Sequence, residues 1–186
     1  IDMPIEHINN RVLRRMARRT TREEITGKIS MIRGKMPDCT IRTSIIAGFP
    51  GETEEEFEEL LSFVKEIRFD RMGVFAYSRE EDTPAADFDG QLDEDVKNER
   101  LDKLMSAQQK ISLEINQSKI GTKQEVLIEG YDMENYMYFG RGRGDSIGID
   151  SRIYVASEDE LGIGDIITAE ILDASEYDLT GKRVKS

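Results

Sequence analysis

The stretch "SIIAGFPGETEEEF", residues 44–57, has the pattern of a strand, a tight turn and the start of a helix. Its opening apolar residues suit a buried strand, and Gly48 and Gly51 mark the turn. Thr53 and Glu56 then have the spacing of a capping box, which begins a helix. The stretch raises a question about function, because a glycine-rich turn ahead of a helix often holds an anion.

A phosphate is a poor match for this turn. A phosphate-binding loop carries a lysine and a hydroxyl residue at its end, and this turn has no lysine. The start of the helix is instead crowded by Glu52, Glu54, Glu55 and Glu56. Their negative charges would repel a phosphate. From these residues alone, a tight strand-to-helix turn with a good cap remains the plain alternative.

Strand and helix patterns alternate along the chain up to about residue 118. Met3–Ile5 has the pattern of a strand end, and further strands are expected at Thr40–Ala47 and Met72–Tyr77. Helices are expected after the capping boxes of Thr21 and Thr53, and from about Asp93 to Ser118. Strands separated by helices indicate parallel pairing. The chemistry of such a sheet lies at the carboxyl ends of its strands, so the loops that follow the three strands should meet at one rim.

The pattern changes after Gly121 to short strands with glycines and acidic residues between them. These strands are expected at about 124–130, 136–140, 153–157 and 166–172. They indicate a small antiparallel β-barrel. The predicted fold class is therefore α/β plus all-β. We expect an α/β part at 1–92, a connecting helix at 93–121 and the small barrel at 122–186.

Composition and charge favour a globular, cytoplasmic protein with a basic partner. The chain has 186 residues, 38% of them hydrophobic, and no run of about 18 apolar residues that could span a membrane. The only cysteine, Cys39, excludes an internal disulfide or a thiolate metal cage made within this chain. We expect it to be packed rather than reactive. The net charge of −12 repels nucleic acid at long range.

Three motifs follow one another in the predicted α/β part: "HINNRVLRRMARRTT" at 7–21, "GFPGET" at 48–53 and "YSREEDTPAA" at 77–86. In this order and separation they resemble the radical S-adenosylmethionine (SAM) methylthiotransferases. The region after Gly121 resembles the OB-like TRAM domain that ends these enzymes. The resemblance covers nearly the whole chain. It implies the C-terminal part of a radical SAM barrel, which is a partial TIM-type barrel, followed by the TRAM barrel.

In that family the strand before "GFPGET" lines the adenosine pocket, so the turn would hold a nucleoside rather than a phosphate. Ile46 and Phe49 would then pack near the adenine, and Ser44 would face the ribose. Gly48 and Gly51 would let the backbone come close. The cofactor-binding residues that the resemblance implies are Glu6, His7, Arg18, Ser44, Ile46, Gly48, Phe49 and Gly51.

Three of these positions carry specific expectations. Arg18 would pair with the SAM carboxylate, a role that suits the planar guanidinium; the alternative is a solvated helix face. Glu6 stands where the family usually has a glutamine, and its carboxylate could accept hydrogen bonds from the ribose or the amino group. His7 is either a pocket residue or a polar group of the core. Asp82, outside this set, stands where a glycine is common.

The family cleaves SAM reductively at a [4Fe–4S] cluster and inserts a methylthio group. The resemblance implies two [4Fe–4S] clusters in the full-length enzyme, with their ligands upstream of Ile1. We therefore expect no catalytic residue and no metal ligand within this chain. An electron donor such as flavodoxin or ferredoxin is also implied.

The substrate expected from the resemblance is an aspartate of a small-subunit ribosomal protein. The segment "DASEYDLTG", residues 173–181, resembles the branch of the family that modifies this protein rather than tRNA. Charge agrees, because residues 123–186 carry seven basic and fourteen acidic side chains, a net −7 that favours a basic protein over RNA. Arg141 and Arg143 could form a small anion site, but in an acidic domain they are expected to be internal ion-pair partners. A tRNA methylthiotransferase and a module that only docks a partner remain the alternatives.

Overall fold

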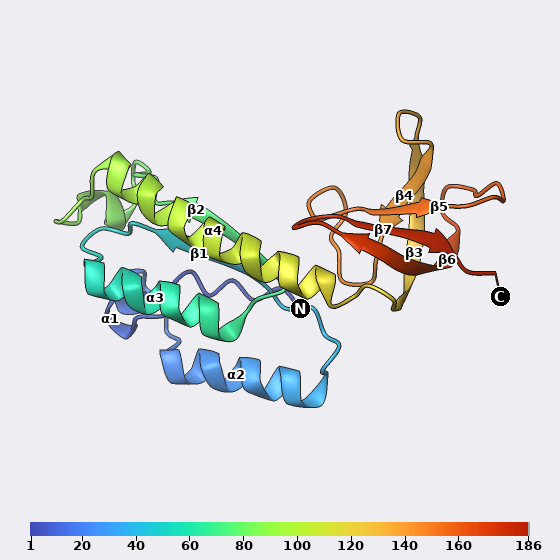
Figure 1. The fold of residues 1–186 in the computed structure, drawn as a ribbon. Helices are drawn as coiled ribbons and strands as arrows, with labels where there is room; N and C mark the ends of the chain where they lie inside the picture. Colours follow the sequence, from blue (N-terminus) through green and yellow to red (C-terminus); the bar gives the residue numbers. More distant parts are fainter. Residues whose placement is uncertain (186) are drawn as a thin grey trace. The chain divides into compact units, whose positions relative to one another are not determined.

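The structure, a computed structural model, describes residues 1–185, and the chain divides into two compact units, Ile1–Ile111 and Ser112–Ser186 (Figure 1). The division falls within helix α4 (Glu94–Gln117). Among residues 1–185 there is no helix with the length and apolar character that a membrane crossing requires. The borders predicted after residues 92 and 121 stay predictions.

The first unit is built around two parallel strands. Its elements before α4 are α1 (Asn10–Arg15), α2 (Arg22–Lys35), β1 (Arg42–Ala47), α3 (Glu54–Ile67), β2 (Arg71–Ala76) and a 3-10 turn, η1 (Pro84–Asp87). β1 pairs with β2 in parallel, so that Ser44 lies opposite Gly73 and Ile46 opposite Phe75. The N-terminal segment adds isolated parallel bridges to β1 at Asp2 and Glu6. The predicted parallel pairing is confirmed.

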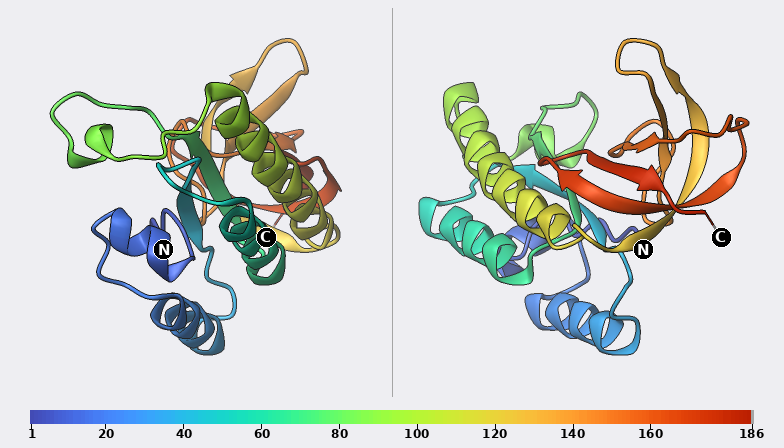
Figure 2. Two further views of the ribbon diagram at one scale, coloured as in Figure 1. Left: turned by 90° about the vertical axis from the view of Figure 1, so that its left-hand side faces the viewer. Right: turned by 45° about the vertical axis from the view of Figure 1, so that its right-hand side comes forward.

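Helices α2 and α3 begin where the sequence predicts, whereas no start is predicted for α1. Both capping boxes form. Thr21 and Glu24 cap the N-terminus of α2, and Thr53 and Glu56 cap the N-terminus of α3. In Figures 1 and 2, α3 lies between α2 and α4. Arg33 of α2 donates to the carbonyl of Arg68 at 2.7 Å, which ties the C-terminal ends of α2 and α3 together.

The two faces of the small sheet differ in how far they are covered. On β1, Thr43, Ile45 and Ala47 are buried, whereas Ser44 and Ile46 are only half-buried. Phe75, the neighbour of Ile46 on β2, is 61% exposed. Side chains alternate between the faces of a strand, so Ser44, Ile46 and Phe75 share one face. We call it the open face, defined by Glu6, Ser44, Ile46, Gly73 and Phe75.

The second unit is a closed five-stranded barrel in the order β3-β4-β5-β7-β6 (Figure 1). Its strands are β3 (Lys123–Asp132), β4 (Met137–Arg141), β5 (Ile153–Ala156), β6 (Ile166–Ala174) and β7 (Leu179–Arg183). Its core is formed by apolar side chains of the strands, among them Val126, Ile128, Val155 and Ile171.

The predicted small barrel is confirmed, with two corrections. The fifth strand, β7, was missed because it has only one large apolar inward residue, Leu179, and its other buried position is Gly181. β7 pairs with β5 in parallel, so the barrel is not wholly antiparallel. All other pairs between strands of the barrel are antiparallel within the described residues.

Candidate functional site

The open face brings together two polar residues of the predicted site. Ser44 donates from Oγ to Glu6 Oε1 at 3.2 Å. Glu6 also exchanges backbone hydrogen bonds with β1, donating to the Ser44 carbonyl at 3.0 Å and accepting from the Ile46 amide at 2.9 Å. These bonds hold Glu6 at φ 65°, a left-handed conformation that non-glycine residues seldom adopt. Such strained residues cluster at functional sites.

An apolar wall lies beside this polar pair. Phe75 is next to Ile46 across β1 and β2, and its ring leans over Gly73, where an added Cβ would lie 3.5 Å from the ring. Sequence reasoning missed Phe75. Its two-residue spacing from Gly73 and Tyr77 predicts that the three residues lie on one face of an extended segment. A carboxylate, a hydroxyl and an exposed aromatic ring on one surface can hold the polar and flat parts of a nucleoside.

The turn after β1 is filled by its own glutamate. The Glu52 side chain is fully buried, and its Oε2 accepts hydrogen bonds from the amides of Gly48 at 3.0 Å and Phe49 at 3.3 Å. Its Oε1 accepts from Arg100 Nη1 at 2.7 Å. The glycine-rich turn therefore does hold an anion, and that anion is a carboxylate of the same chain. A second anion such as phosphate would find these two amides occupied and would be repelled by the Glu52 carboxylate.

The two glycines of the turn allow close approach of other protein segments. Gly48 has φ 76°, and a Cβ there would lie 2.5 Å from Lys97 Cγ of α4. Gly51, also at φ 76°, donates to the carbonyl of Gly90 at 2.7 Å. Gly48 is thus favoured by close packing and by its positive φ, and Gly51 by its positive φ. Their approach to a bound nucleoside stays a prediction.

Phe49 and the end of β2 meet at the rim of the sheet. The Phe49 ring packs edge-on against Tyr77, with the centroids 5.3 Å apart, and against Phe88 at 6.2 Å. The loop that follows Tyr77 contains Asp82 at φ 62°, a conformation that fits the glycine expected there. The loops that follow β1 and β2 therefore come together at one rim, as the β-α order predicts.

His7 lies in the core, next to the turn. Its side chain is fully buried, and Nδ1 accepts a hydrogen bond from the amide of Asn9 at 3.0 Å. Nε2 lies 3.6 Å from Glu52 Oε2, beyond hydrogen-bond distance. Of the two expectations for His7, this burial favours the polar core group. A direct contact with a cofactor remains a prediction.

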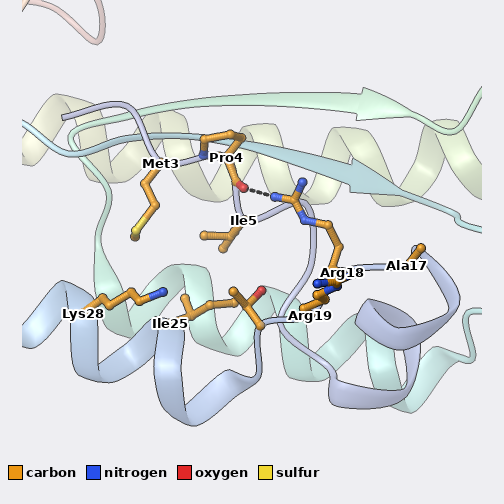
Figure 3. A pocket seen from close by; sticks show the side chains of 9 residues that line it. Met3, Pro4, Ile5, Ala17, Arg18, Arg19, Ile25 and Lys28 are labelled. Atoms are coloured by element: carbon orange, nitrogen blue, oxygen red, sulfur yellow. Dashed lines mark hydrogen bonds between the residues drawn. The ribbon is translucent and has the colours of Figure 1, made fainter.

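Arg18 lines a separate pocket of about 350 Å³ (Figure 3). Its guanidinium donates to the carbonyl of Pro4. The pocket lies between the N-terminal segment and α2, and its lining residues are Met3, Pro4, Ile5, Ala17, Arg18, Arg19, Thr20, Ile25 and Lys28. Arg18 is half-buried rather than fully solvated. Its guanidinium is thus fixed near the start of the segment that carries Glu6.

A second ion pair holds the other side of the turn. Arg11 of α1 donates from Nε to Glu56 Oε1 at 2.6 Å, and its Nη2 donates to the Gly51 carbonyl at 2.5 Å. The hydrogen bond from Arg11 holds the pKa of the Glu56 carboxyl below its usual value, and the same bond raises the pKa of Arg11. Arg11 therefore links α1 to α3 through an ion pair and to the turn through a hydrogen bond.

The basic residues of the acidic barrel are mostly engaged with acidic ones. The pairs are Arg141 with Glu129 at 2.8 Å, Arg143 with Glu125 at 3.6 Å, Lys182 with Glu170 at 3.3 Å, Arg183 with Asp159 at 3.0 Å and Lys185 with Asp159 at 3.6 Å. The guanidinium of Arg152 stacks on the Phe139 ring at 4.5 Å. The expectation that Arg141 and Arg143 form internal ion pairs is confirmed.

Comparison with known proteins agrees with this two-part architecture. The radical SAM superfamily profile matches residues 1–64, and the TRAM domain profile matches residues 120–184. A protein named ribosomal protein uS12 methylthiotransferase RimO, from Clostridioides difficile (strain 630), is 53% identical over 180 residues, which is 97% of this chain. The chain belongs to the radical SAM methylthiotransferase family.

Other members with the same printed name are similar over the same range. The protein of Caldanaerobacter subterraneus subsp. tengcongensis is 50% identical over 182 residues, and that of Geotalea uraniireducens (strain Rf4) is 47% identical over 185 residues. The chain covers 98% and 99% of its own length in these matches, but only 41% of each relative. It thus spans about two fifths of the curated relatives it matches. The predicted family and fold class are confirmed.

Proposed function

We propose that the full-length protein carrying this chain transfers a methylthio group to an aspartate of ribosomal protein uS12. The observation that carries this proposal is the 53% identity, across 97% of the chain, to a protein named for that activity. The similarity includes the barrel, which is the part expected to distinguish a protein substrate from tRNA. Since ribosomes assemble in the cytoplasm, we place the enzyme there.

We propose the open face and the adjoining rim as the SAM pocket. Glu6 and Ser44 would accept and donate hydrogen bonds to the ribose hydroxyls, while Ile46 and Phe49 would pack near the adenine. The half-buried Glu6–Ser44 pair supports this assignment, because it offers both a donor and an acceptor beside an apolar wall. Arg18 would bind the carboxylate by leaving the Pro4 carbonyl and reaching from its separate pocket towards the segment that carries Glu6. SAM and its cluster supply the radical chemistry; these residues orient the cofactor and exclude water.

We place the ligands of both [4Fe–4S] clusters in the part of the full-length protein outside this chain. Such clusters are held by several cysteine thiolates, and Cys39 is the only cysteine here. It is half-buried. Among residues 1–185 no group of three or more His, Cys, Asp or Glu side chains could hold a metal ion. A flavodoxin or a ferredoxin would supply the electrons.

The acidic barrel is proposed to bind the basic ribosomal protein. Most of its basic side chains are occupied in ion pairs within the barrel, so its excess of seven negative charges is left to act on a partner. RNA would be repelled by the same excess. This supports uS12 as the substrate over tRNA.

The activity is tested with the full-length protein, loaded with its clusters and supplied with SAM and a reductant. Mass spectrometry should detect one added methylthio group on uS12 and none on uS12 whose acceptor aspartate is replaced by asparagine. A tRNA anticodon stem-loop should remain unmodified. Modification of the stem-loop with no modification of uS12 would replace this proposal with the tRNA activity.

Docking is tested separately, by titrating the full-length protein with uS12 and with the stem-loop at two salt concentrations. Binding of uS12 should be tighter, and it should weaken as salt shortens the Debye length from about 10 Å at 0.1 M. Tighter, salt-sensitive binding of the stem-loop would contradict the role given to the acidic barrel.

A further inference from the structure

Two buried cations of α4 lie against the turn at residues 48–52. Lys97 and Arg100 are only 3% and 5% exposed, although lysine and arginine are seldom buried without partners. The Lys97 side chain occupies the space beside Gly48 and pairs with Glu94, Nζ to Oε1, at 2.6 Å. Arg100 reaches Glu52. The N-terminal part of α4 therefore packs against residues 48–52 and restrains their conformation from one side.

Arg100 uses the two ends of its guanidinium differently. Nη1 donates to Glu52 Oε1 at 2.7 Å and to the Glu52 carbonyl at 3.2 Å, both in the interior. Nη2 donates at 2.9 Å to Oε2 of Glu54, a side chain that is 59% exposed. The guanidinium also stacks on the Phe57 ring at 5.1 Å. Only the Nη1 end is connected to the turn.

The Glu52 carboxylate bridges Arg100 and the backbone amide of Phe49. One carboxylate oxygen faces Arg100, and the other accepts from the amides of Gly48 and Phe49. Loss of the carboxylate would leave both amides, which belong to buried residues, without their acceptor. The orientation of the Phe49 ring against Tyr77 depends on this short segment.

We propose that Glu52 and Arg100 are positioning residues for the cofactor pocket. Through this pair α4 fixes the conformation of residues 48–52 and so places Phe49 beside the adenine. The inference rests on the proposed SAM pocket and assigns a role to two residues that do not themselves touch the cofactor. It predicts that the pair affects SAM binding more than it affects binding of the protein substrate.

The test compares Glu52→Gln with the matched control Glu54→Gln. The side-chain amide introduced by Glu52→Gln has a donor group where the carboxylate had an acceptor, so it must oppose either Arg100 or the backbone amides. Glu54→Gln removes the charge of the exposed partner of Arg100 but can keep an acceptor oxygen there, and it leaves the contact between Arg100 and Glu52 in place. Hydrogen exchange at the Gly48 and Phe49 amides is measured in the full-length protein. SAM and uS12 affinities are measured in the full-length protein.

Glu52→Gln should speed exchange of both amides and weaken SAM binding, each by about tenfold or more, with uS12 affinity unchanged. Glu54→Gln should change none of the three. Arg100→Lys keeps the positive charge but loses the planar guanidinium with its two Nη donors. It should weaken SAM binding to an intermediate extent. The exchange and SAM results would also stand if uS12 were not the substrate, since neither measurement involves methylthio transfer.

Unchanged amide exchange or unchanged SAM affinity in Glu52→Gln would overturn the inference. An equal loss of SAM and uS12 affinity would also overturn it, because that result indicates a general loss of structure. If Glu52→Gln fails to fold, Arg100→Lys decides. A folded Arg100→Lys protein with wild-type SAM affinity would show that α4 does not position the turn.

Discussion

Ser44 donates a hydrogen bond from its hydroxyl to Glu6 Oε1 at 3.2 Å, and this bond joins β1 to the N-terminal segment on the open face. Glu6 sits at φ 65°, so its backbone is held in a conformation that has a cost for any residue other than glycine. A half-buried carboxylate on a residue with a strained backbone fits a binding role better than a role in stability.

This pair leads to a prediction about position 6. In the full-length protein, Glu6→Gln should keep SAM affinity within about threefold, because glutamine retains the acceptor oxygen and is the residue that the family resemblance predicts at this position. Glu6→Gly should relieve the backbone strain yet weaken SAM binding about tenfold, since it removes the hydrogen-bonding group. Equilibrium dialysis with SAM checks both. Wild-type affinity in Glu6→Gly would remove Glu6 from the pocket.

Arg18 gives a second prediction about the cofactor. If its guanidinium pairs with the SAM carboxylate, Arg18→Ala should lose roughly 1.5–3 kcal/mol of binding free energy, which is about ten- to hundredfold in affinity. Arg19→Ala, at an exposed neighbour in the same pocket, is the control. Binding of 5′-methylthioadenosine, which has no carboxylate, should be the same in all three proteins. Equal losses for SAM and this analogue would mean that Arg18 only supports the fold near Pro4.

The order of elements could be predicted because its signals are local. The capping boxes at Thr21 and Thr53 depend on residues three positions apart, and both form. The role of Glu52 could not be predicted in this way. Its partner Arg100 lies 48 positions away, and the sequence shows only a glutamate that would repel phosphate. β7 was missed for a related reason, since Gly181 is buried by close backbone packing and adds nothing to an apolar pattern.

The Arg11–Glu56 ion pair predicts how the first unit responds to acid. Because the folded-state pKa of Glu56 is lowered, the pair stabilises the fold above the ordinary glutamate pKa. This contribution is lost as the pH falls from about 4.5 through the lower folded-state pKa. Glu56→Gln should therefore cost about 1 kcal/mol at neutral pH, a modest value because Arg11 is partly exposed.

The measurement is urea unfolding followed by helical circular dichroism, because α1, α2 and α3 lie in the first unit and α4 lies mostly there. The difference between wild type and Glu56→Gln should shrink progressively as the pH falls below about 4.5, because the carboxylate then becomes protonated. Glu66→Gln, at an exposed position on the same helix, is the control and should change little. A difference that stays constant with pH would contradict an electrostatic origin.

Two glycines allow the barrel to close. A Cβ on Gly140 would lie 2.0 Å from the Leu127 carbonyl oxygen, and one on Gly181 would lie 2.5 Å from the Glu170 carbonyl oxygen. Both glycines lie beside a shift in strand register, one between Ile128 and Gly130 and the other between Ile171 and Asp173. Register shifts bend strands sharply, and glycine permits the close backbone approach that results.

Gly140→Ala should accordingly destabilise the barrel by about 2 kcal/mol or more, because backbone rather than a flexible side chain must move to admit the methyl group. Gly162→Ala is the matched control, since its Cβ would meet nothing closer than 3.5 Å. Tyrosine fluorescence during urea unfolding reports this unit selectively. The chain has no tryptophan, and of its six tyrosines only Tyr77 lies in the first unit. If Gly140→Ala and Gly162→Ala unfold at the same urea concentration, β3 and β4 can separate at this crossing without cost, and the close approach does not determine barrel closure.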